Sequence, residues 1–154
     1  MASVLVLEVL NDALHPNLSE IVVEYLPIEV STIAGSVQGY LDGPVSVARF
    51  NSPWGVASGH DGAIYVADSA NHCIRVIRDG MVTTLIGQPQ ANFVDTAEKQ
   101  LSKPSGLAFD HAGHLLVTSR SRVYKVTLPD GELSTLAGTT AEGHDDGPAL
   151  EATF

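Results

Sequence analysis

Lysine and arginine are scarce in this sequence: eight of them stand against 18 aspartate and glutamate residues, which gives a formal net charge of −10. The first of the eight is Arg49, so acidic side chains are the only permanently charged ones before it. Proteins that bind nucleic acids place clustered Lys and Arg side chains against the phosphates. We therefore expect no nucleic-acid partner.

Cysteine and long apolar runs are also lacking. The single cysteine, Cys73, cannot form an internal disulfide, so nothing in the sequence requires an oxidising compartment. No apolar stretch approaches the roughly 20 residues of a membrane-spanning helix, and the N-terminus lacks the basic segment of a signal peptide. We expect a cytoplasmic protein without membrane contact, and 154 residues are typical of one domain.

What the sequence does contain is an internal repeat. The segments Pro53–Ala57 and Pro104–Ala108 align at the same shift that superimposes Asp79-Gly80 on Asp130-Gly131. Between these blocks, Arg75-Val76 aligns with Lys125-Val126 if one residue is missing from the second copy. A repeat of about 50 residues is typical of chains built from copies of one small structural unit.

Each copy is predicted to form four short strands. In the first copy they are Trp54–Ala57, Ala63–Ala67, Cys73–Ile77 and Val82–Ile86, separated by turns that contain Gly, Asp and Asn. Four antiparallel strands per repeat is the pattern of a β-propeller blade. The predicted fold class is therefore all-β, with propeller blades at residues 50–87 and 101–138.

A different pattern precedes the repeats. Five apolar residues between 18 and 26 have the spacing of one helical face: Leu18, Ile21, Val22, Tyr25 and Leu26. Pro16 suits the first position of a helix and Pro27 ends it, while Val4–Leu14 is a candidate for a second helix. We predict a short α-helical appendage over residues 1–27.

The repeats resemble a known family. The segments that carry the resemblance are Phe50–Ala57, Gly62–Asp68 and Asn71–Val76, flanked by Ser31–Gly35 and Asp42-Gly43-Pro44, and together they are similar to an NHL repeat. The second copy departs from this pattern, with Ser119 in the place of Asp68. The resemblance covers residues 30–154 and implies a β-propeller whose usual role is to present loops for binding.

Counting the motifs predicts an incomplete propeller of about two blades. Residues 30–35 are expected to form an outer strand without a blade of its own, and residues 146–154 resemble the start of a third blade. Closed propellers contain about 4–8 blades. The chain is therefore expected to be a fragment of a longer propeller protein, the alternative being head-to-tail self-association into a ring.

Several polar residues are candidates for a site, and none is assigned a catalytic, cofactor-binding or metal-binding role. The six histidines lack the convergent spacing of a zinc site; His60 and His111 occupy equivalent turns of different blades, so they are not expected to converge. Asp68 and Asn71 could serve as a calcium ligand or catalytic acid, but we favour a turn that they stabilise. Cys73 is expected to be a partly buried, inert thiol.

Two functions remain open. The first is a non-enzymatic scaffold that binds protein partners through its propeller blades. The second is a propeller enzyme of the lactonase or lyase type, with calcium or zinc held at the axis. The sequence favours the scaffold, because no nucleophile elbow, phosphate loop or metal motif occurs in it, and no cofactor is expected.

Overall fold

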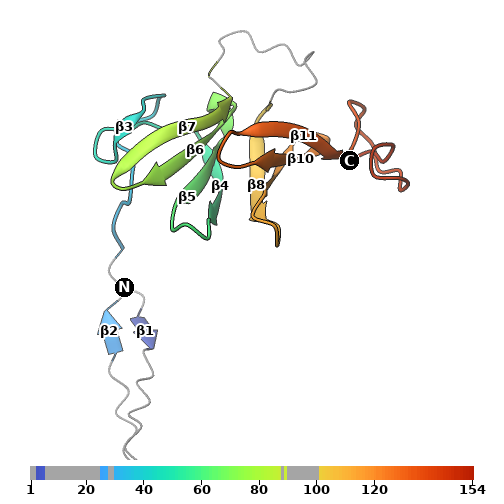
Figure 1. The fold of residues 1–154 in the computed structure, drawn as a ribbon. Helices are drawn as coiled ribbons and strands as arrows, with labels where there is room; N and C mark the ends of the chain where they lie inside the picture. The colour runs from blue at the N-terminus through green and yellow to red at the C-terminus, as the bar shows by residue number, and fades with distance from the viewer. Residues whose placement is uncertain (1–2, 6–24, 28–29, 88, 90–100) are drawn as a thin grey trace, which may run out of the picture. The chain divides into compact units, whose positions relative to one another are not determined.

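The structure is a computed structural model that describes residues 3–5, 25–27, 30–87, 89 and 101–154. The chain divides into two compact units, Met1–Thr32 and Ile33–Phe154. The larger unit contains two antiparallel sheets and the connections between them (Figure 1). No helix within the described ranges is long and apolar enough to span a membrane.

The N-terminal unit contains a pair of strands where helices were predicted. Strand β1 (Ser3–Leu5) pairs antiparallel with β2 (Tyr25–Pro27), with Val4 opposite Leu26. The predicted helical appendage is therefore wrong at both of these segments, and the rest of it lies outside the described residues. Valine, leucine and tyrosine suit a pleated strand as well as an apolar helical face, so backbone pairing decided between the two.

The first sheet has the strand order β3-β7-β6-β5-β4. Its bounds are β3 Gly43–Pro44, β4 Pro53–Ser58, β5 Ile64–Asp68, β6 Cys73–Arg78 and β7 Met81–Gly87, with a 3₁₀ turn, η1, at Ser69–Asn71. The four strands predicted for the first repeat are thus confirmed. The added strand, β3, pairs with the outer strand β7 through Gly43 opposite Val82.

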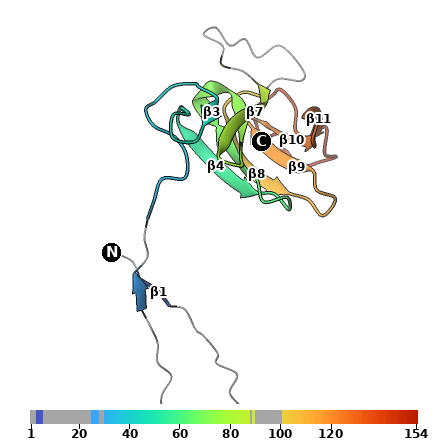
Figure 2. The ribbon, with the colours of Figure 1, turned by 60° about the vertical axis from the view of Figure 1, so that its left-hand side comes forward.

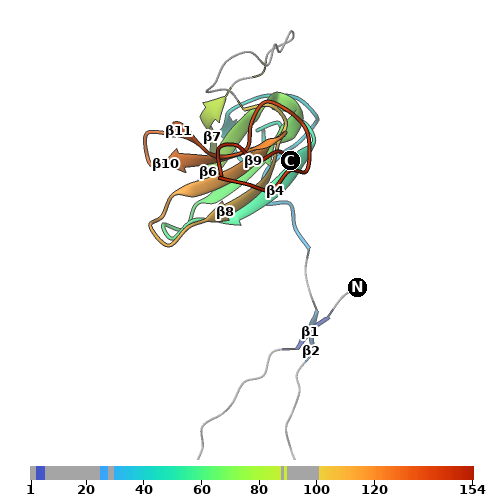
Figure 3. The same ribbon diagram turned by 90° about the vertical axis from the view of Figure 1, so that its right-hand side faces the viewer.

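The second sheet has the order β11-β10-β9-β8. Its strands are β8 Pro104–Phe109, β9 Leu115–Ser119, β10 Arg122–Thr127 and β11 Glu132–Ala137. Its edge strand β8 lies beside β4, which is an edge strand of the other sheet (Figure 2, Figure 3). The predicted all-β class with four-stranded antiparallel repeats is confirmed.

The two sheets share one apolar core. It consists of aliphatic side chains with two tyrosines: Ala63, Tyr65, Ala67, Ile74, Val76, Leu101, Leu115, Val117, Tyr124, Val126 and Leu133. Tyr65 meets the ring of Phe109 edge-on, with 5.2 Å between the ring centroids. The backbones of the two sheets approach closely at Gly55, where an added Cβ would overlap the backbone carbonyl of Ser105.

The register of the second sheet corrects the alignment of the repeats. Arg75 lies opposite Val66, and the residue opposite the equivalent Val117 is Tyr124 rather than Lys125. Two residues, not one, are therefore missing from the second copy. The turn between the second and third strands explains the difference, because it spans residues 69–72 in the first sheet and only 120–121 in the second.

Residues 30–35 were predicted to be an outer strand, and this prediction is wrong. They contain no strand, and a strand forms only where its backbone finds a partner to pair with. Instead, the Gly35 N–H donates to the carbonyl of Val45 at 3.0 Å. Residues 146–154, predicted to begin a third blade, likewise form turns without a strand.

Candidate functional site

A buried arginine organises the first sheet. Arg75 lies on β6 with its side chain fully buried, and its guanidinium contacts two carboxylates: Asp68 at 2.9 Å and Asp42 at 2.6 Å. It also donates to the backbone carbonyls of Arg49 and Leu41, at 2.9 and 2.8 Å. A guanidinium presents five donors in a fixed fork, and this site supplies acceptors on several sides of it.

Two aromatic rings complete the surroundings of this guanidinium. Its central carbon lies 4.8 Å from the ring centroid of Tyr40 and 4.9 Å from that of Phe50. Both rings belong to residues 35–50, which we call loop 35–50. The loop therefore holds Arg75 through a carboxylate, two carbonyls and two ring faces, a set of contacts suited to a desolvated cation.

Asp68 is fully buried and is bound on several sides. It accepts the backbone N–H of Asn51 at 2.7 Å and the side-chain amide of Asn71 at 2.8 Å, in addition to Arg75. Asn71 donates in turn to the carbonyl of Gly39 at 2.9 Å. These bonds tie loop 35–50 and the turn after β5 to the sheet, so the contacts of Asp68 are those of a structural residue.

The second sheet replaces this charged cluster with neutral groups. Ser119 takes the position of Asp68, and its hydroxyl accepts the N–H of Ser102 and donates to the same residue's carbonyl, both at 2.8 Å. Tyr124 takes the position of Arg75 and is 3% exposed. The charges have thus been replaced together, which avoids leaving one of them buried alone.

Cys73 lies beside the cluster and is fully buried. Burial, together with the charges of Asp68 and Asp42, raises the pKa of its thiol to about 12, although Arg75 opposes the shift. A thiol that stays protonated is a poor nucleophile. The thiol is buried more completely than the sequence indicated.

The histidines that the structure describes do not converge. His60 and His111 lie in the turns that precede β5 and β9, and His114 binds Asp110 at 2.8 Å. Hydrogen bonds from His114 lower the pKa of Asp110. Within the described ranges no three His, Cys, Asp or Glu side chains are grouped as metal ligands.

His72 links the two sheets. It adopts a left-handed backbone conformation, with φ of 56°, and its Nδ1 accepts the backbone N–H of Lys103 at 3.1 Å. Burial, followed by the positive charges of Lys103 and Arg120, lowers the pKa of His72. The neutral ring is therefore the form that bridges β6 to the start of β8.

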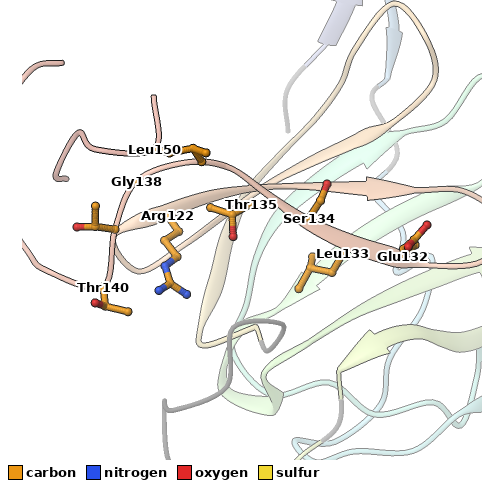
Figure 4. A pocket seen from close by; sticks show the side chains of 9 residues that line it. Arg122, Glu132, Leu133, Ser134, Thr135, Gly138, Thr140 and Leu150 are labelled. Atoms are coloured by element: carbon orange, nitrogen blue, oxygen red, sulfur yellow. The ribbon is translucent and has the colours of Figure 1, made fainter. Parts of the chain in front are cut away.

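An open depression of about 540 Å³ lies along the outer edge of β11 (Figure 4). Glu132 and Leu133 line it, and their counterparts Met81 and Val82 pair with β3 in the first sheet. In the described part of the chain, no strand pairs with this edge of β11. The depression therefore marks the place that a fifth strand occupies in the first sheet.

Sequence reasoning missed the roles of Arg75 and Asp42. The available signal was an arginine within the apolar run Cys73–Ile77, because a charged residue on a buried strand requires a partner. In the sequence, Asp42 stands out only as part of the Asp42-Gly43-Pro44 segment. Nothing local links it to Arg75, which lies 33 residues further along the chain on β6.

Two antiparallel sheets of four and five strands, packed through their first strands, are consistent with partial blades of a β-propeller. Residues 50–77 match the NHL repeat. This match covers β4, β5 and β6, together with Asp68, Asn71 and Arg75. The chain therefore carries an NHL repeat, in agreement with the resemblance seen in its sequence.

Two curated proteins are similar to parts of the chain. Protein SUPPRESSOR OF QUENCHING 1, chloroplastic, from Arabidopsis thaliana is 36% identical over 108 residues, which is 66% of this chain and 10% of the plant protein. NHL repeat-containing protein 2 from Gallus gallus is 50% identical over 58 residues, 36% of this chain and 8% of the avian protein. The chain thus spans about a tenth or less of the length of these relatives.

Solved structures from Bacteroides thetaiotaomicron overlap with the chain in part. An auxiliary nutrient binding protein has 20% identity and a TM-score of 0.43, covering 55% of this chain and 25% of that protein. A structural genomics protein of unknown function has 18% identity and a TM-score of 0.37, covering 80% of this chain and 54% of that one.

Proposed function

We propose that this chain is a non-enzymatic, cytoplasmic scaffold that binds protein ligands as part of a longer NHL propeller. The observation that carries the proposal is the arginine cluster. Asp68 and Arg75 are the buried ionised residues of the described ranges, and each is bound to other groups of the first sheet. Neither side chain is left to act on a substrate.

The exposed face of β4 is suited to packing against a further sheet. Trp54 and Val56 on β4 are 79% and 68% exposed. Their counterparts in the second sheet, Ser105 and Leu107, lie on the side of β8 that packs against the first sheet. An adjoining sheet would cover the tryptophan in the same way, which leaves ligand binding to the turns.

The turns before β5 and β9 form the best candidate surface for a ligand. They lie at the same end of the two sheets (Figure 1), and the ring of His60 is 6.2 Å from that of Phe109. His60, Asp61 and His111 are all exposed there. Surface loops held by rigid sheets are the usual carriers of binding residues.

The test is protein capture followed by reconstitution. The immobilised chain, a His60→Ala/His111→Ala variant and a Glu142→Ala variant are exposed to the same extract, and a protein retained by the parent is then purified. We expect its affinity to fall about tenfold for the double variant, a loss of about 1.4 kcal/mol, and to be unchanged for Glu142→Ala, a control that removes an exposed side chain from another loop.

Two results would contradict the proposal. One is binding that does not distinguish the double variant from its control. The other is hydrolysis of a lactone panel that requires Ca²⁺ or Zn²⁺ and stops when EDTA is added.

A further inference from the structure

Residues 138–154, here called loop 138–154, repeat the backbone hydrogen bonds of loop 35–50. In loop 35–50 the bonds are Gly35 N to Val45 O (3.0 Å), Gly39 N to Phe50 O (3.0 Å), Ala48 N to Pro44 O (3.0 Å) and Arg49 N to Leu41 O (3.1 Å). In loop 138–154 they are Gly138 N to Ala149 O (2.8 Å), Gly143 N to Phe154 O (3.2 Å), Ala152 N to Pro148 O (3.0 Å) and Thr153 N to Asp145 O (3.1 Å). The two loops therefore share one backbone conformation.

The shared conformation extends to the groups that hold Arg75. By position, Asp146 corresponds to Asp42, and the carbonyls of Asp145 and Thr153 correspond to those of Leu41 and Arg49. The rings of His144 and Phe154 correspond to those of Tyr40 and Phe50. Loop 138–154 thus carries a carboxylate, two carbonyls and two rings at the positions whose counterparts surround a guanidinium in the first sheet.

In loop 138–154 this arrangement is open. Phe154 is 55% exposed, and Asp145 and Asp146 are also exposed. The ion pairs found among the described residues do not include Asp146. An acidic, partly aromatic surface of this kind is complementary to an arginine side chain.

The position of the loop indicates where the arginine must come from. Loop 35–50 runs directly into β4 and binds an arginine from the sheet that follows it. A second copy of this chain is a poor source, because its Arg75 is already held by its own Asp42. The second sheet is excluded as well, because it carries Tyr124 at the position of the arginine.

We propose that loop 138–154 is a preformed receptor for one further NHL-type sheet that directly follows Phe154, and that Asp146 binds an arginine on the third strand of that sheet. The receptor works as loop 35–50 does: the carboxylate and two carbonyls accept the guanidinium protons, and the rings of His144 and Phe154 cover its faces. This inference does not depend on the protein-binding role proposed above.

The test is an extended chain in which residues 51–87 are appended directly after Phe154. Met81→Leu in the appended copy gives a distinct mass to the peptides that span its third strand and residue 81, and Met81 is 44% exposed in the first sheet. Hydrogen exchange of the appended third strand reports whether the new sheet has formed. The original residues 51–87, which follow loop 35–50 and have the same sequence apart from Met81, serve as an internal reference for protection.

Four single variants of the extended chain, and one combination of two of them, locate the contact. Asp146→Asn, or Arg75→Gln in the appended copy, should each speed exchange of the appended third strand by about tenfold or more, and together they should have little further effect. Asp145→Asn is the matched control, because it removes a neighbouring charge but keeps the carbonyl that the receptor uses. Asp42→Asn should speed exchange of the original first sheet only.

The proposal would be overturned by any of three results. The first is that the appended segment exchanges as freely as an unfolded chain while the original residues 51–87 stay protected. The second is that Asp146→Asn changes the exchange no more than Asp145→Asn does. The third is that light scattering shows protection to arise from dimers, in which the appended sheet binds the loop of another molecule.

Discussion

Tyr124 occupies in the second sheet the position that Arg75 occupies in the first. Each lies on the third strand of its sheet, opposite equivalent valines, Val117 and Val66. Arg75 is surrounded by carboxylates, carbonyls and rings, whereas Tyr124 belongs to the apolar core. One strand position is thus compatible with a charged or a neutral residue, provided that its neighbours change with it.

The first prediction concerns this exchange. Asp68→Ala should lower the free energy of unfolding by about 3–5 kcal/mol, because it leaves a buried guanidinium without one of its carboxylates. Urea denaturation followed by circular dichroism measures the loss. Asp68→Ser/Arg75→Tyr, which installs the pair found in the second sheet, should cost clearly less than the sum of its two single variants. Additive losses would show that the two residues are not coupled.

The second prediction concerns pH. Since the pKa of His72 is lowered in the folded protein from its ordinary value of 6.5, the unfolded chain takes up the proton first as the pH falls. The contribution of His72 to stability is therefore complete above about pH 6.5 and decreases below it. Unfolding midpoints between pH 5 and 8 should show this dependence, and it should be flatter in His72→Asn, since asparagine tolerates positive φ. Equal slopes in the two proteins would contradict it.

The third prediction concerns Cys73. With a pKa of about 12, only about one thiol in ten thousand is ionised at pH 8, and the side chain is fully buried. An aromatic disulfide reagent should therefore react with the folded protein only at the rate at which the first sheet opens. In urea the thiol should react at once. Rapid reaction under native conditions would show that the thiol is accessible.

The fourth prediction concerns the contact between the sheets. Gly55→Ala places a methyl group against the backbone carbonyl of Ser105, which cannot move without separating β4 from β8. We expect a loss of about 2 kcal/mol or more of unfolding free energy. Gly106→Ala is the matched control, because its methyl group would meet the hydroxyl of Thr118, a side chain that can rotate. Similar losses in the two variants would place the closest approach elsewhere.

The sequence by itself determined the strands of both repeats. Prolines, glycines and turn residues mark their ends, and runs of Val, Ile and Leu mark their interiors, so local patterns are enough to place them. The matching motifs also determined that the two sheets are copies of one design. For the same reason, the turn at Asp68 and Asn71 could be read from the sequence.

Tertiary structure decided which residues meet. Because one turn is two residues shorter in the second copy, Tyr124 rather than Lys125 takes the place of Arg75. The segments before and after this region match at a single shift, so a sequence alignment conceals the difference. Asp42 meets Arg75 across the sheet, and residues 30–35 form no strand. Both outcomes depend on partners distant in the chain, because a buried charge and a strand's backbone are satisfied by whatever folding brings beside them.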